Sequence, residues 1–87
     1  MALRILGAQG HVAERLREAI AAALPGAVVE VRAGGGGHFE LRVVAEAFRG
    51  RSRLHQHQMV YRAIAPLMAG DAPPVHAVDQ LVTEVPS

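Results

Sequence analysis

The fold is decided by the stretch HFELRVVAEAFRGRS, which occupies residues 38–52. From residue 38 to residue 45 the apolar side chains recur at every second position, and this period of two predicts a strand with one buried face. The expected inward positions are Phe39, Leu41, Val43 and Ala45. The segment Phe48-Arg49-Gly50 then predicts a turn, and Ser52 is a suitable N-cap because its hydroxyl accepts a hydrogen bond from an early backbone N–H of a helix.

Upstream of this strand the sequence predicts a helix and a second strand. Residues 34–37 are four consecutive glycines, and a β-branched segment at residues 27–32 precedes them, so an antiparallel hairpin is expected. Before the hairpin, apolar residues four positions apart predict an amphipathic helix over residues 11–24, with the stripe Val12, Leu16, Ile20 and Leu24. Pro25-Gly26 is expected to end this helix.

Downstream, the pattern predicts a second helix and a third strand. The helix is expected to follow Ser52 and to end or kink at Pro66, with the apolar stripe Leu54, His57, Val60, Tyr61, Ile64 and Met68. A strand is expected over residues 75–82, with Val75, Ala77, Asp79 and Leu81 on one face. The order α-β-β-α-β indicates an α+β fold in which both helices pack on one face of a three-stranded sheet.

The length and composition of the chain exclude several classes of function. Eighty-seven residues suffice for one domain with a single core. The absence of cysteine excludes disulfides, thiol nucleophiles and any iron–sulfur cluster ligated by thiolates of this chain. No run approaches the ~18 apolar residues of a membrane span, and the first seven residues lack the apolar stretch of a secretory signal. We therefore expect a cytoplasmic protein without membrane contact.

The motifs of the central stretch are similar to those of a known family. Residues 38–44, Phe48-x-Gly50-x-Ser52, His57-x-x-Val60-Tyr61 and Val75-His76-Ala77-Val78 together resemble the BolA family, in the expected order and spacing. The resemblance runs from about residue 12 to residue 82. It implies one BolA-like domain over residues 1–87, with a core of about residues 11–83, and a KH-like fold of class II with a mixed sheet.

The resemblance also implies a function. BolA-like proteins pair with monothiol glutaredoxins and share a 2Fe–2S cluster, which is held by the glutaredoxin cysteine, glutathione and His or Cys residues of the BolA protein. His76 matches the C-terminal histidine ligand of the family. The usual second ligand is absent from the glycine loop, and His38 is the nearest substitute. With imidazoles alone, this chain is expected to hold no cluster by itself, although imidazoles can ligate one iron of such a cluster.

A second function remains open, because some bacterial members of the family are DNA-binding regulators of stress response and morphology. No acid occurs between Ala47 and Gly70, whereas Arg49, Arg51, Arg53 and Arg62 lie there. These arginines are candidates for contacts with phosphates or for docking the glutaredoxin. A weak homodimer is a third partner state that the sequence leaves open.

The remaining candidates are assigned structural roles. His57, Tyr61, Phe39, Phe48 and Gly50 are expected to support the fold, His57 by packing its ring on the apolar stripe. Neither a nucleophile elbow nor a catalytic triad is recognisable around the few hydroxyl residues, and the glycine loop is not followed by the Lys-Ser/Thr of a phosphate-binding loop. We therefore expect no enzymatic activity.

Overall fold

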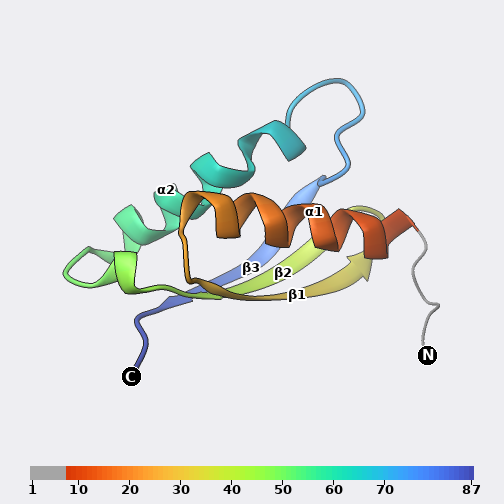
Figure 1. Cartoon of the computed structure of the whole chain (residues 1–87). Coiled ribbons are helices and arrows are strands. Elements are labelled where there is room, and N and C mark those ends of the chain that lie inside the picture. The colour runs from red at the N-terminus through yellow and green to blue at the C-terminus, as the bar shows by residue number, and fades with distance from the viewer. Residues whose placement is uncertain (1–7) are drawn as a thin grey trace, which may run out of the picture.

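The computed structural model describes residues 8–87, arranged as two helices above a three-stranded sheet (Figure 1). The prediction about a secretory signal falls on Met1–Gly7 and lies outside the described residues. The elements, in chain order, are α1 (Ala8–Ala23), β1 (Val28–Gly35), β2 (His38–Val44), the short 3-10 helix η1 (Glu46–Phe48), α2 (Arg53–Ile64), the 3-10 helix η2 (Ala65–Leu67) and β3 (Ala77–Glu84).

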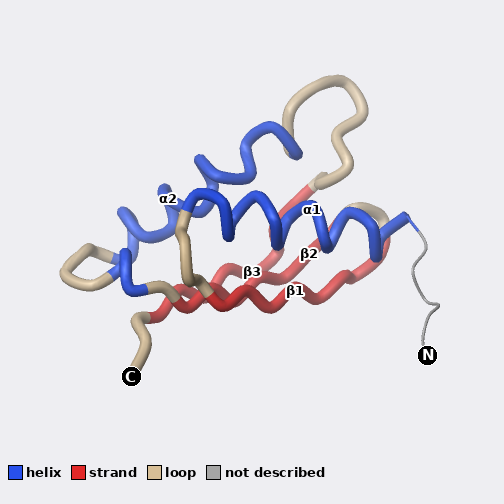
Figure 2. The backbone as a smooth tube through the Cα atoms, viewed as in Figure 1, coloured by secondary structure: helices blue, strands red, loops and turns tan. Residues whose placement is uncertain are grey.

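The sheet is mixed, with strand order β1-β2-β3. β1 pairs with β2 antiparallel and β3 pairs with β2 parallel, so the chain crosses back through α2 before β3 begins. Figure 2 shows both helices on the same side of the sheet. The predicted α+β class, the α-β-β-α-β order and the mixed sheet are confirmed.

The core forms where β2 meets the two helices. The predicted inward positions over residues 38–45 are all buried, as are Leu16 and Ile20 on α1 and Leu24, which directly follows that helix. Phe48 is fully buried. Gly50 has a backbone φ of +79°, which residues other than glycine rarely adopt. Phe39 and Phe48 are thus part of the core, and Gly50 has a backbone conformation that favours glycine.

The first strand is longer than the sequence predicts. β1 continues to Gly35, which pairs with His38, and only Gly36 and Gly37 remain as a two-residue turn. Both turn glycines have positive φ, 65° and 82°, as a hairpin turn of the primed type requires. The glycine run therefore contributes to the strand as well as to the turn.

The facing pattern predicted for the third strand is wrong, because β3 contains a bulge. Phe39 pairs with Val78, but the next residue of β2, Glu40, pairs with Gln80, so Asp79 is the extra residue. The bulge reverses the alternation, and Val78 and Leu81, which were predicted on opposite faces, both pack against the core.

The predicted stripe of the second helix is partly wrong. Val60 and Ile64 are buried, but Leu54 is 69% exposed and Tyr61 is 38% exposed. Gln56 faces inward instead: its side-chain amide donates to the carbonyls of Phe48 (3.2 Å) and Arg51 (3.0 Å). Its carbonyl oxygen accepts from the Thr83 hydroxyl at 2.6 Å. These bonds turn α2 so that Leu54 and Tyr61 lie outside the core.

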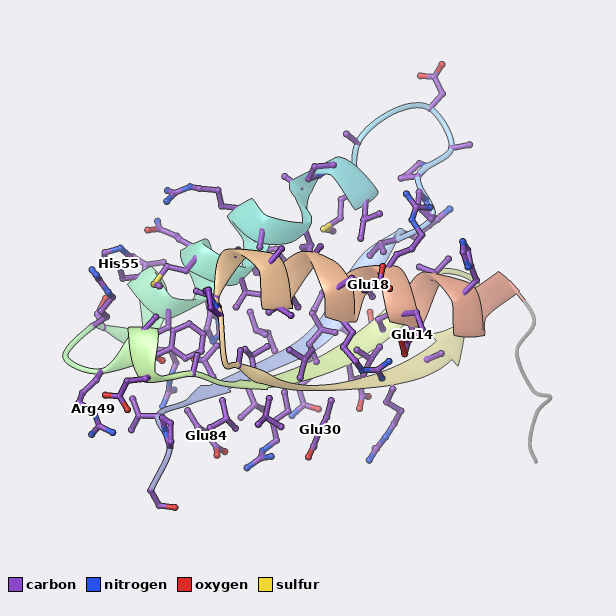
Figure 3. All side chains as sticks on the ribbon, viewed as in Figure 1. Glu14, Glu18, Glu30, Arg49, His55 and Glu84 are labelled. Atoms are coloured by element: carbon purple, nitrogen blue, oxygen red, sulfur yellow. The ribbon has the colours of Figure 1, made fainter. Side chains whose placement is uncertain are left out.

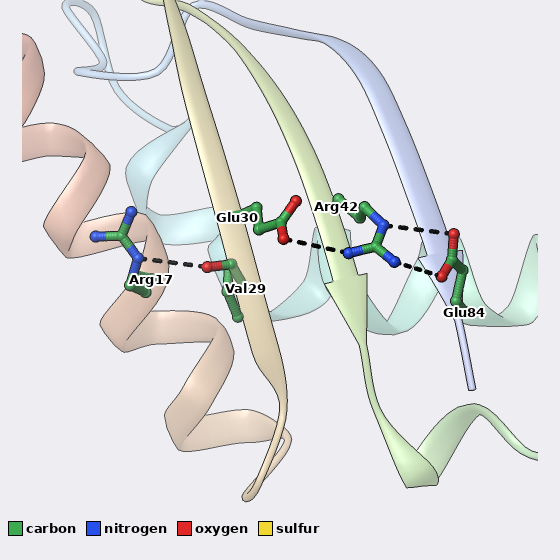
Figure 4. Close-up of polar contacts among 5 residues, drawn as sticks. All are labelled: Arg17, Val29, Glu30, Arg42 and Glu84. Atoms are coloured by element: carbon green, nitrogen blue, oxygen red, sulfur yellow. Dashed lines mark hydrogen bonds and ion pairs between the residues drawn. The ribbon is translucent and has the colours of Figure 1, made fainter. Parts of the chain in front are cut away.

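The face of the sheet away from the helices carries an ion-pair row across all three strands (Figure 4). Arg42 on β2 donates to Glu84 on β3 at 2.8 Å and to Glu30 on β1 at 3.2 Å. The hydrogen bond and charge of Glu84, together with Glu30, raise the pKa of Arg42. The positive charge of Arg42 is thus balanced by the carboxylates of Glu84 and Glu30 and is little available to a partner.

None of the helices between Ala8 and Ser87 has the length and apolar character that crossing a membrane requires.

Candidate functional site

His76 lies immediately before β3, at the end of the sheet where the β1–β2 hairpin turns. Its side chain is exposed, and its backbone N–H donates to the carbonyl of Gly37 at 2.8 Å. The N–H of Ala77 donates to the same carbonyl at 3.2 Å. The hairpin turn therefore anchors the backbone that carries His76 and leaves its ring open to a partner.

Gly37 also touches the ring of His76. A Cβ atom built on Gly37 would lie 2.9 Å from Cδ2 of His76, closer than Cβ atoms lie to neighbouring atoms in proteins. A side chain at this position would push the His76 ring away, and the φ of +82° also favours glycine. Gly37, the last glycine of the run, thus leaves room for the ring of His76, the predicted ligand.

His38 begins β2 and pairs in register with Ala77, the residue after His76. Because β2 and β3 run parallel, the two predicted histidines lie at the same end of the sheet, with Gly37 joined to one and packed against the other. The Nδ1 atom of His38 lies 3.0 Å from Oδ1 of Asp79.

Asp79 was not predicted as a site residue. Its signal in the sequence is only that it lies three residues after His76, and the bulge that places it beside His38 is visible only in the strand register. Within residues 8–87, no three His, Cys, Asp or Glu side chains lie close enough to hold a metal ion together. The site therefore offers imidazole donors and one carboxylate, but not a complete coordination sphere.

The arginines of the basic stretch do not converge on one surface. Arg49 is engaged with Glu46 and donates to the carbonyl of Pro86 at 3.1 Å, and Arg51 donates to the carbonyl of Ala47 at 3.1 Å. Arg53 lines a groove against β3, with His57, Leu81, Val82 and Thr83. Arg62 lines a different groove, between α2 and the end of α1, with Leu24 and Met59.

The separation of Arg53 and Arg62 follows from helix geometry. Nine residues at about 100° each place two side chains on opposite sides of a helix. Figure 3 shows Arg49 and His55 near the start of α2, at the end of the molecule opposite the hairpin turn. The basic stretch is therefore distributed around α2, and its first arginine, Arg49, lies far from the hairpin turn (Figure 3).

The structural histidine predicted on α2 is half-buried. His57 lines the groove beside Arg53, while Ser52 caps the helix as predicted, its hydroxyl accepting from the backbone N–H of His55 at 3.1 Å. The ring of His57 does not lie between Leu54 and Tyr61 in a buried stripe, since both of those residues are exposed.

Replacing Arg49 with alanine is expected to raise the pKa of Glu46. The hydrogen bond from Arg49 holds the pKa of Glu46 below its ordinary value of 4.5. A lowered pKa in the folded state stabilises the folded chain above the ordinary value, and this contribution is lost as the pH falls through the folded-state pKa. An NMR titration of the Glu46 carboxyl carbon measures the shift, with Arg53→Ala as the control; an unchanged pKa in Arg49→Ala would show that the pair does not form.

The chain is similar in sequence to known proteins of one family. The family model described as BolA-like protein matches residues 16–86. BolA-like protein 1 of Pongo abelii is 36% identical over 81 residues, covering 83% of this chain and 57% of its own length. The human protein of the same name gives the same identity and coverage. The chain thus spans little more than half the length of these curated relatives.

Solved structures agree with this family match. A bol-like protein from Babesia bovis superposes with a TM-score of 0.72 at 25% identity, over 85% of this chain and 84% of that chain. The BolA domain of SufE1 from Arabidopsis thaliana superposes with a TM-score of 0.70 at 28% identity, over 98% of this chain and 96% of that chain.

Proposed function

This chain belongs to the BolA-like protein family, and on that premise we propose that it is a non-enzymatic adaptor that binds a monothiol glutaredoxin and shares a 2Fe–2S cluster with it. Members of this family act as regulators and adaptors. The observation that carries the proposal is the position of His76: exposed, anchored by the Gly37 carbonyl, and at the same sheet end as His38.

The chemistry of the donor set supports sharing over independent binding. A 2Fe–2S cluster needs four ligands, and imidazole is accepted on one of its irons. Two exposed imidazoles with no thiolate fit the part of a chain that completes a coordination sphere begun by a partner's cysteine and by glutathione. In this proposal His76 is the principal ligand and His38 the second.

DNA binding remains the alternative proposal, with less support. The arginines that would contact phosphates are spread around α2, and Arg49 is already paired with Glu46. Weak electrostatic binding through the two remaining helix arginines would lose affinity steeply as salt is added. Sequence-specific binding that survives physiological salt, measured by fluorescence anisotropy, would favour this alternative.

His76→Ala is expected to weaken cluster sharing by about tenfold or more, because losing a ligand costs at least as much as losing one of the outer-shell partners that orient it. The chain is titrated into a monothiol glutaredoxin loaded with its cluster and glutathione, and the visible absorption and circular dichroism are followed. The matched control is His55→Ala, which removes a histidine from the opposite end of the molecule (Figure 3).

The expected result is a changed spectrum with the wild-type chain and with His55→Ala, and a much smaller change with His76→Ala at the same concentration. A spectrum that stays unaltered at saturating wild-type chain would contradict the proposal.

A further inference from the structure

The bulge in β3 brings a carboxylate to one of the two histidines. Asp79 is the residue that has no partner on β2, and its Oδ1 lies 3.0 Å from Nδ1 of His38. His38 pairs with Ala77, so Asp79 is its diagonal neighbour on the face of the sheet away from the helices. We infer that Asp79 is a positioning residue that orients His38 and presents its Nε2 atom to a metal held by a partner, an inference that rests on the proposed function.

The hydrogen bond fixes which nitrogen of His38 is free. An ionised carboxylate only accepts hydrogen bonds, so a neutral imidazole that bonds to it through Nδ1 must carry its proton on Nδ1. The lone pair is then on Nε2, and metal ligands among histidines are commonly oriented in this way by a carboxylate on the other ring nitrogen. Asp79 thereby selects the tautomer that ligation through Nε2 needs.

Asp79 is the acid that contacts His38 on this face of the sheet. The next acid on the same face, Glu40, faces Arg32 on β1 at 3.5 Å, which leaves Asp79 as the carboxylate in contact with His38. The side chains of His38 and Asp79 are 49% and 51% exposed, so the ring is held on one edge while the other edge remains accessible to a docking protein. A flexible glycine turn alone would not orient the ring.

The first test uses the free chain and needs no cluster. Proton–nitrogen correlation spectra of ¹⁵N-labelled imidazoles report the tautomer of each neutral histidine, recorded at a pH where the rings are unprotonated. We expect wild-type His38 to be mainly the Nδ1–H form, and Asp79→Ala to shift it toward the Nε2–H form. Asp71→Ala is the matched control, because Asp71 is an exposed aspartate of the loop before β3.

The second test uses the complex with the cluster-loaded glutaredoxin. Asp79→Ala is expected to weaken the spectral change by about tenfold, the lower end of what loss of such an outer-shell partner costs. Asp79→Asn, whose amide oxygen still accepts from Nδ1–H, is expected to recover part of the loss. Asp71→Ala is expected to behave as wild type.

The two ways of failing are distinguishable. A His38 tautomer that is the same in the wild type and in Asp79→Ala would overturn the positioning role, whatever the cluster does. A spectral change that is insensitive to both His38→Ala and His76→Ala would overturn the proposed function, even where Asp79 controls the tautomer. A spectral change that depends on His38 but responds equally to Asp79→Ala and Asp71→Ala would overturn the inference alone.

Discussion

Gly37→Ala is expected to destabilise the chain by about 2–5 kcal/mol and to displace the ring of His76. A non-glycine residue in the left-handed region costs roughly 1–2 kcal/mol, and crowding a packed site adds about 1–3 kcal/mol. Gly37 has a φ of +82°, and an added Cβ would lie 2.9 Å from Cδ2 and 3.2 Å from Cγ of His76. The ring must move, and cluster sharing through His76 is expected to fall with it.

Gly35→Ala is the matched control for this substitution. Gly35 has a φ of +92° and nothing within 4 Å of an added Cβ, so the variant has the backbone strain without the contact to His76. Urea unfolding gives the two free energies, and NMR shifts of the His76 ring report its displacement. Equal stability losses and equal His76 shifts in the two variants would show that Gly37 makes no special room for the ligand.

Phe48→Ala is expected to lower the free energy of unfolding by about 3–5 kcal/mol, the usual cost of removing a buried aromatic ring. Phe48 is completely buried between the end of β2 and the start of α2. Because a small domain has only about 5–15 kcal/mol of stability in total, this single change removes a large share of it. The measurement is urea denaturation followed by far-ultraviolet circular dichroism.

Leu54→Ala tests the orientation of α2 in the same assay. Leu54 was predicted in the apolar stripe, but it is largely exposed in the structure, so its truncation is expected to change stability by no more than about 0.5 kcal/mol. A loss as large as that of Phe48→Ala would mean that α2 is rotated and that the predicted stripe was correct.

The sequence predicted the fold where one periodicity dominates. The alternation over residues 38–45 and the fourfold spacing of Leu16, Ile20 and Leu24 each have a single way of burying their apolar side chains, and the core contains those residues. For α2 the apolar residues alone suggested the wrong rotation, because the orientation is set partly by the hydrogen bonds of a polar residue, Gln56. The spacing of apolar residues carries no information about such side-chain hydrogen bonds.

The candidate site was predicted in part for a similar reason. The resemblance supplied His76, and His38 followed as the nearest histidine to the glycine turn. The contact of Asp79 with His38 and the close approach of Gly37 to His76 could not be predicted from the sequence. Both depend on the register between strands that are far apart in the sequence. The pattern of apolar and polar residues along one strand does not show where a one-residue bulge occurs.

In the proposed function, a histidine nitrogen of this chain ligates iron in a cluster that a glutaredoxin mostly holds. The most direct measurement is pulsed electron paramagnetic resonance of the reduced complex, in which only this chain carries ¹⁵N-labelled histidine. We expect nitrogen couplings that change from ¹⁴N to ¹⁵N on labelling and that are lost or reduced in His76→Ala. A cluster whose spectrum contains no coupling to the labelled nitrogen would contradict it.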